Sequence, residues 1–166
     1  SNVFLLLAGK AVLQGSRYMI DYPPKPIAYP ALRYSERSFI YAENAHNFGI
    51  RGRGVIDGNG DTFIYLSLKD VSMSRGSTAW GRENPRPDYF PFERRPFTIH
   101  FVQSRQIDVR EVTIRNTPMV AQQYLACQDL TVEGVTVDSL QNPNIDALDV
   151  VSCRNVRIAN CDLSSS

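Results

Sequence analysis

The stretch Ser104–Ile114 reads SRQIDVREVTI, and its pattern returns without gaps as CQDLTVEGVTV at Cys127–Val137 and as CRNVRIANCDL at Cys153–Leu163. In all three copies the fourth, sixth, ninth and eleventh residues are apolar. The spacing of two within each pair is the period of a strand with one buried face. A spacing of three between the pairs places the second pair on the opposite face of the strand unless the chain bends. Each copy therefore predicts two short strands on either side of a corner.

The copies begin 23 and then 26 residues apart, and weaker copies begin at Asn47 and Asn2. Repeats of this length without helical periodicity predict the coils of a parallel β-helix. We then expect equivalent residues of successive coils, such as Ile107, Leu130 and Val156, to stack on one inward face. An antiparallel β-sandwich is the alternative, and the gapless repeats disfavour it. The predicted corners are Arg110-Glu111, Glu133-Gly134 and Ala159-Asn160.

A polar residue precedes the first apolar position of each copy. A column of such side chains is able to satisfy backbone groups of the turns from coil to coil. The residues are Asn47, Gln106, Asp129 and Asn155.

Composition places the chain among ordinary globular proteins and excludes several functions. Its 166 residues suit one domain, and 43% apolar with 21% charged residues excludes a disordered chain. The net charge of +1 does not favour a nucleic-acid partner or an anionic membrane surface. The longest apolar run, Val3–Ala8, is far shorter than the roughly 20 residues of a membrane span. Three cysteines without a C-x-x-C pair, far from both histidines, argue against a zinc site, and we expect no metal or cofactor.

One long stretch interrupts the repeats and predicts a loop inserted at about residues 63–97 of a single partial β-helix domain, 1–166. It combines glycines, prolines and aromatic residues with several arginines, among them Arg94 and Arg95. Long loops in compact domains are often functional, and arginines beside aromatic rings suit a sugar that carries carboxylates. A proline-rich flap with solvated arginines is the alternative.

The densest chemical pattern is NPNIDALDVVSC at Asn142–Cys153, where Asp146 and Asp149 are three residues apart just before a predicted strand. The preceding coil contributes Val120 and Gln123 to the same place. Carboxylates on the wall of a β-helix are suited to general acid or base roles in hydrolysis. An Asx-type turn with solvated acids fits these residues equally well. For the Asp146 carboxylate to point outward, the backbone must bend near Ala147, because strict alternation places Asp146 on the same face as the apolar residues that follow.

Motifs along most of the chain resemble glycoside hydrolase family 28, the polygalacturonase and rhamnogalacturonase group. Each motif is short, and their order and spacing carry the resemblance. They are Ser1-Asn2-Val3, Leu13-Gln14-Gly15-Ser16, Asp21-Tyr22-Pro23, Ile40-Tyr41-Ala42-Glu43-Asn44, Gly52-Arg53-Gly54-Val55-Ile56-Asp57-Gly58-Asn59-Gly60, Arg95-Pro96, Asn116-Thr117-Pro118, Asn144-Ile145-Asp146-Ala147-Leu148-Asp149 and Ser152-Cys153-Arg154-Asn155-Val156.

The resemblance implies a right-handed parallel β-helix, incomplete at both ends, that belongs to a pectin-degrading hydrolase with an inverting mechanism and no cofactor. Asp146 matches the Asp of the family's Asn-Thr-Asp motif and would act as general base, with Asp149 as the second candidate. Asn144, Gln123, Arg94 and Arg95 would contact substrate. Ile145 and Ala147 depart from the usual Thr and Gly, and Val120 and Gln123 stand where the family often has Trp and His.

The family's paired Asp-Asp, Gly-His-Gly and Arg-x-Lys motifs do not occur before Ser166. We therefore expect an internal fragment that lacks the general acid and is inactive alone. The implied partner is a pectic polysaccharide or oligogalacturonide, for a secreted or periplasmic enzyme that is monomeric at full length. A β-helix polysaccharide lyase and a non-catalytic β-helix stalk or binding module are the alternatives. A lyase leaves unsaturated chain ends, whereas a hydrolase leaves only reducing ends.

Overall fold

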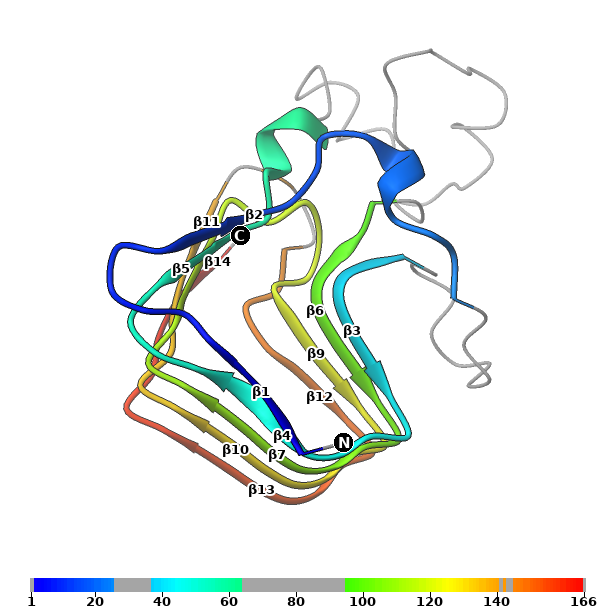
Figure 1. Cartoon of the computed structure of the whole chain (residues 1–166), viewed down its shortest axis with the longest axis vertical. Helices are drawn as coiled ribbons and strands as arrows, with labels where there is room; N and C mark the ends of the chain where they lie inside the picture. The colour runs from blue at the N-terminus through cyan, green and yellow to red at the C-terminus, as the bar shows by residue number, and fades with distance from the viewer. Residues whose placement is uncertain (1, 26–36, 64–94, 141, 143–144, 166) are drawn as a thin grey trace.

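A computed structural model gives the fold of the chain and describes residues 2–25, 37–63, 95–140, 142 and 145–165. Its strands form three sheets around a common core (Figure 1). Sheet A contains β1 (Val3–Leu6), β4 (His46–Arg51), β7 (Arg105–Arg110), β10 (Gln128–Glu133) and β13 (Arg154–Ala159). Sheet B contains β2 (Val12–Gln14), β5 (Val55–Asp57), β8 (Thr113–Arg115), β11 (Thr136–Ser139) and β14 (Asp162–Ser165). Sheet C contains β3 (Ser38–Glu43), β6 (Phe97–Val102), β9 (Gln122–Leu125) and β12 (Asp149–Val151).

Successive coils run from sheet C to sheet A to sheet B and then return to sheet C. The short 3-10 helices Met19–Asp21 and Gly60–Phe63 follow β2 and β5 on this return. Every strand pairing within the described residues is parallel, which confirms the parallel β-helix and excludes the antiparallel sandwich. Its coils are right-handed, as crossovers between parallel strands of one sheet are. The loop predicted at about residues 63–97 falls mainly on residues 64–94, which lie outside the described residues, so it stays a prediction.

The predicted register between coils is confirmed. Leu130 of β10 aligns with Ile107 of β7 and with Val156 of β13. Ile107 and Leu130 are each only 1% exposed, because coils cover them on both sides. Inside the stack, the Phe101 ring packs edge-on against Phe48 and Tyr124, with centroids 4.9 Å and 5.8 Å away. The repeated apolar pattern therefore builds one continuous core.

The corners are turned by residues with positive φ, stacked from coil to coil. At the corner between sheets A and B, Glu111, Gly134 and Asn160 have φ of 61°, 64° and 54°. A residue in the left-handed conformation changes the direction of the backbone at a single position. Residues other than glycine, asparagine and aspartate adopt this conformation uncommonly. The corner between sheets C and A repeats this feature at Asn44, Gln103, Ala126 and Ser152.

The residues of the predicted polar column, which lie in sheet A, also adopt the left-handed backbone conformation. They have φ between 48° and 55°, and Asn2 of the first coil joins them at 63°. The amide of Asn47 donates to Oδ1 of Asn2 at 2.7 Å, and the amide of Asn155 donates to Oδ1 of Asp129 at 2.8 Å. These side chains therefore bond to one another between coils.

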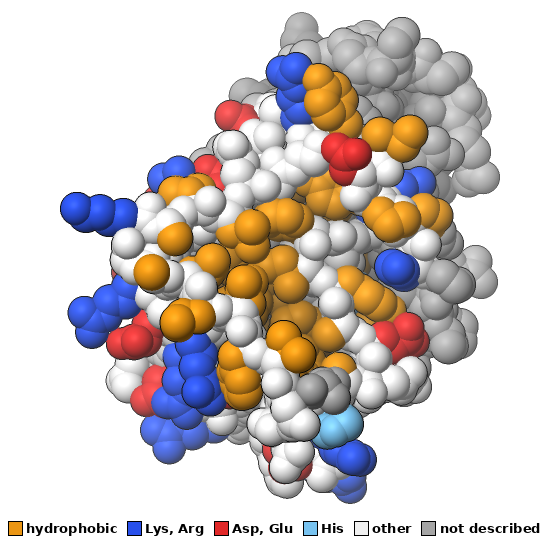
Figure 2. Space-filling view, in the orientation of Figure 1, with side chains coloured by type: hydrophobic (Ala, Val, Ile, Leu, Met, Phe, Trp, Pro, Cys, Tyr) orange, Lys and Arg blue, Asp and Glu red, His pale blue; other side chains and the backbone are white. Residues whose placement is uncertain are grey.

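Apolar side chains are exposed at the two ends of the stack. Figure 2 shows them gathered at the centre of the end that faces the viewer. On the outermost strands Val3 is 67% exposed and Ile158 is 46% exposed, whereas Val109 and Val132 in the middle of sheet A are fully buried. The difference arises because an outermost coil has a neighbour on one side only.

Candidate active site

Asp146 lies three residues before β12, where the chain enters sheet C. Its side chain is exposed, while the neighbouring Ile145 is fully buried. The backbone N–H of Ala121 donates to the Asp146 carbonyl at 2.9 Å, which joins this segment to the preceding coil. The backbone bends at Ala147. The bend that the sequence required is therefore present, and it turns the Asp146 carboxylate toward solvent although its neighbours enter the core.

Asp149 is the first residue of β12 and stands directly beside Gln123 of β9. The Gln123 amide donates to Oδ2 of Asp149 at 3.2 Å. Partial burial raises the pKa of Asp149, the Gln123 hydrogen bond partly opposes the increase, and the negative charge of Asp146 adds to it. The structure thus brings Asp146, Asp149 and Gln123 together and couples the charges of the two carboxylates.

The column that contains Gln123 and Asp149 continues into two further coils of sheet C. Gln123 pairs with His100 of β6, and His100 pairs with Tyr41 of β3. His100 has no exposed surface, and its Nδ1 lies 3.3 Å from the hydroxyl of Ser38. Burial lowers the pKa of His100 to about 4, so this imidazole is neutral at pH 7.

Two polar atoms of this column are buried without a hydrogen-bond partner within the described part of the chain. They are Nε2 of His100 and Oε1 of Gln123, on directly paired residues. Such atoms are costly to bury, and native proteins contain few of them. Sequence reasoning included Gln123 but missed His100. The available signal was the polar residue inside the apolar run FTIHFV at Phe97–Val102.

The other predicted site residues are placed differently. Arg95 has no exposed surface, and its Nη1 donates to the Pro118 carbonyl at 2.7 Å. Its predicted contact with substrate stays a prediction, and the buried guanidinium gives it no support. Val120 is also buried and packs with Phe97 and Met119. Arg94 and Asn144 lie outside the described residues.

Metal-binding clusters and membrane-spanning helices are both absent from the described part of the chain. No group of three or more His, Cys, Asp or Glu residues there is arranged to hold a metal ion. No helix within the described ranges is long and apolar enough to cross a membrane. Cys127, Cys153 and Cys161 are free thiols.

The pKa of Asp149 leads to a pH-dependent prediction. A carboxyl whose pKa is raised by folding contributes stability below the pKa of the unfolded chain, about 3.9, and that contribution is lost as pH rises through the folded value. The uncharged amide of Asp149→Asn does not undergo this loss. The melting temperature of the variant minus that of the wild type should therefore increase between pH 4 and pH 7. A difference that stays constant across these pH values would contradict the raised pKa.

Comparison with known proteins identifies relatives in sequence and in fold. The sequence model of Glycosyl hydrolases family 28 matches residues 26–166. A polygalacturonase of Chamaecyparis obtusa is 24% identical over 133 residues, which cover 80% of this chain and 23% of that protein. The chain thus spans about a quarter of the length of the curated relative.

Two solved structures share the fold over almost the whole chain. A family 28 exopolygalacturonase of Yersinia enterocolitica has a TM-score of 0.75 at 20% identity, covering 98% of this chain and 34% of its own. A polygalacturonase of Erwinia carotovora has a TM-score of 0.72 at 20% identity, covering 100% of this chain and 43% of its own. At this identity the likeness concerns the fold alone.

Proposed function

The chain belongs to glycosyl hydrolases family 28, and from this premise we propose that it is part of an enzyme that hydrolyses pectic polysaccharide containing galacturonic acid. The observation that carries the proposal is the exposed Asp146 carboxylate beside the half-buried Asp149, in the sequence pattern that resembles the family's catalytic motif. The curated relative that is named as a polygalacturonase supports the same substrate class.

In the proposed mechanism Asp146 is the general base. Its exposed carboxylate accepts a proton from a water molecule, and the water oxygen attacks the anomeric carbon from the face opposite the leaving group. Asp149 and Gln123 act as positioning residues. Their hydrogen bond fixes the first residue of β12, three positions after Asp146, and the two carboxylate charges interact.

We propose an inverting reaction, with the general acid supplied by residues after Ser166. In inverting enzymes the two carboxyl groups stand roughly 6.5 to 9.5 Å apart. One coil advances by about 4.8 Å and one residue by about 3.3 Å, so an acid on the coil after Asp146, offset by two residues along the strand and therefore on the same face, stands about 8 Å away, within that interval. On this proposal residues 1–166 alone do not turn over substrate. The full-length protein would be a monomer, secreted or periplasmic, that needs no metal or cofactor.

Product analysis tests this function directly. Full-length protein is incubated with polygalacturonate, and the release of reducing ends is followed together with ultraviolet absorbance. The proposal expects new reducing ends and no absorbance from unsaturated ends. Unsaturated products would favour a lyase, and an intact polymer would favour a stalk or binding module. Either result would overturn the proposed hydrolysis.

A further inference from the structure

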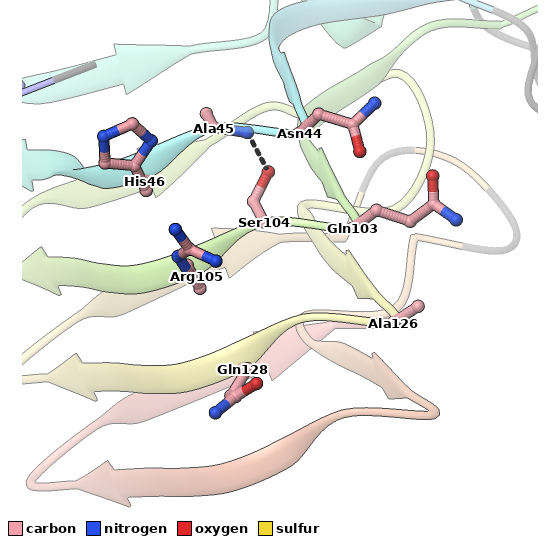
Figure 3. A pocket seen from close by; sticks show the side chains of 8 residues that line it. All are labelled: Asn44, Ala45, His46, Gln103, Ser104, Arg105, Ala126 and Gln128. Atoms are coloured by element: carbon pink, nitrogen blue, oxygen red, sulfur yellow. Dashed lines mark hydrogen bonds between the residues drawn. The ribbon is translucent and has the colours of Figure 1, made fainter.

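A polar groove lies at the corner where sheet C turns into sheet A, at the opposite end of the sheet C strands from Asp146 (Figure 3). Its volume is about 290 Å³. Three successive coils contribute to it. The lining residues are Asn44, Ala45, His46, Gln103, Ser104, Arg105, Ala126 and Gln128.

The shape of the groove follows from the corner geometry. Asn44, Gln103 and Ala126 are the left-handed residues of this corner, with φ of 51°, 46° and 53°. Next to them Ser104 is buried, and its hydroxyl accepts from the Ala45 N–H at 3.1 Å and donates to the Val102 carbonyl at 2.7 Å. The residues on both sides of Ala45 and Ser104 are exposed, and the corresponding residues of the third coil, Ala126 and Gln128, are partly exposed.

Arg105 gives the groove a positive charge, and no carboxylate is among its described lining residues. Its eight lining residues include an arginine and a histidine and no acid. On the rest of sheet A arginines are neutralised by carboxylates, as in Arg51 with Asp108 at 2.6 Å and Arg110 with Glu133 at 2.6 Å. Within the described residues Arg105 has no such ion pair. The nearby carboxylate of Asp129, in the neighbouring column, accepts a hydrogen bond from the Asn155 amide.

The groove continues along one column of sheet A. His46, Arg105, Gln128 and Arg154 align in register on four successive coils. Nη2 of Arg154 donates to Oε1 of Gln128 at 2.8 Å. The backbones of Arg105 and Arg154 thus lie two coils apart, about 10 Å at one strand spacing per coil. The partly exposed Gln128 amide lies between them.

We propose that this corner groove is a second binding site, separate from the Asp146 site, for a polysaccharide that carries carboxylates. The choice of a uronate polymer as ligand rests on the proposed function. Arg105 and Arg154 bind carboxylates of sugars along the chain, since the planar guanidinium matches the two oxygens of a carboxylate. Asn44 and Gln103 hydrogen-bond to sugar hydroxyls. No Phe, Tyr or Trp is among the described residues that line the groove, so recognition depends on charge and hydrogen bonds.

Binding of polygalacturonate by charge variants tests the site. The dissociation constant is measured by affinity electrophoresis, with dextran as the neutral polymer. Arg105→Gln combined with Arg154→Gln should weaken binding at least tenfold. The matched control combines Arg53→Gln with Arg157→Gln, two exposed arginines outside the column, and should change binding less than twofold. Dextran should not bind to either protein.

Specific outcomes would overturn the second site. Unchanged binding in the Arg105 and Arg154 variant would do so, and so would an equal loss in the control, because the attraction would then depend on net charge alone. Failure of the proposed function gives a different result. In that case the full-length protein releases no reducing ends from polygalacturonate, whether or not the arginine column binds it.

Discussion

Asp146→Asn in the full-length enzyme is expected to lower turnover of polygalacturonate at least about a hundredfold, the usual scale for removing a general base. The amide has the size of the carboxylate but cannot accept the proton of the attacking water. Asp146 is exposed and contributes only its backbone carbonyl to the contact with Ala121, so the variant should keep its fold and its affinity for substrate. The rate of reducing-end release, measured with the binding constant, checks both parts.

Asp138→Asn provides the matched control, because Asp138 is an exposed carboxylate on β11, away from sheet C. It should retain wild-type turnover. Near-normal turnover in Asp146→Asn would contradict the assignment of the base. Asp149, the neighbouring carboxylate with a raised pKa, would then be the next residue to replace.

Acidification is expected to destabilise the fold through His100. Burial lowers its pKa from 6.5 to about 4, so the stability that depends on neutral His100 is complete above pH 6.5 and is lost progressively as pH falls toward 4. The difference of about 2.5 pH units corresponds to about 3 kcal/mol of unfolding free energy. His100→Gln, which cannot take up a proton, should lose less stability over this range. Chemical denaturation at pH 7, 5.5 and 4 measures the difference.

His46→Gln is the control for this experiment, since His46 is exposed at the start of β4. Its stability should follow that of the wild type at each pH. If His100→Gln lost as much stability as the wild type between pH 7 and pH 4, the buried neutral imidazole would not be the cause of the acid sensitivity.

The strands of sheets A and B could be predicted from sequence, whereas those of sheet C were harder to identify. The first two sheets face solvent on one side, so their residues alternate in polarity, as in Arg105–Arg110. All six residues of β6, Phe97–Val102, are buried, and a strand buried on both faces has no period of two. For the same reason the register of His100 with Gln123 could not be obtained from the pattern.

The candidate site was predicted in part. Asp146, Asp149 and Gln123 were expected at one place, and they lie there because neighbouring coils align their equivalent residues. The corner groove was not expected. Its polar residues lie at the corner or are the first residues of sheet A strands, where neither periodicity nor spacing distinguishes a binding residue from an ordinary turn or strand residue. Only the stacking of the coils brings Arg105 beside Gln128.

The anomeric configuration of the first product tests the central claim most directly. Full-length enzyme acts on oligogalacturonide inside an NMR tube, and proton spectra are recorded before the new reducing end mutarotates. If Asp146 activates a water molecule for direct displacement, the first sugar released should carry the configuration opposite to that of the cleaved bond. A first product that retains the original configuration, or that carries an unsaturated end, would contradict the account.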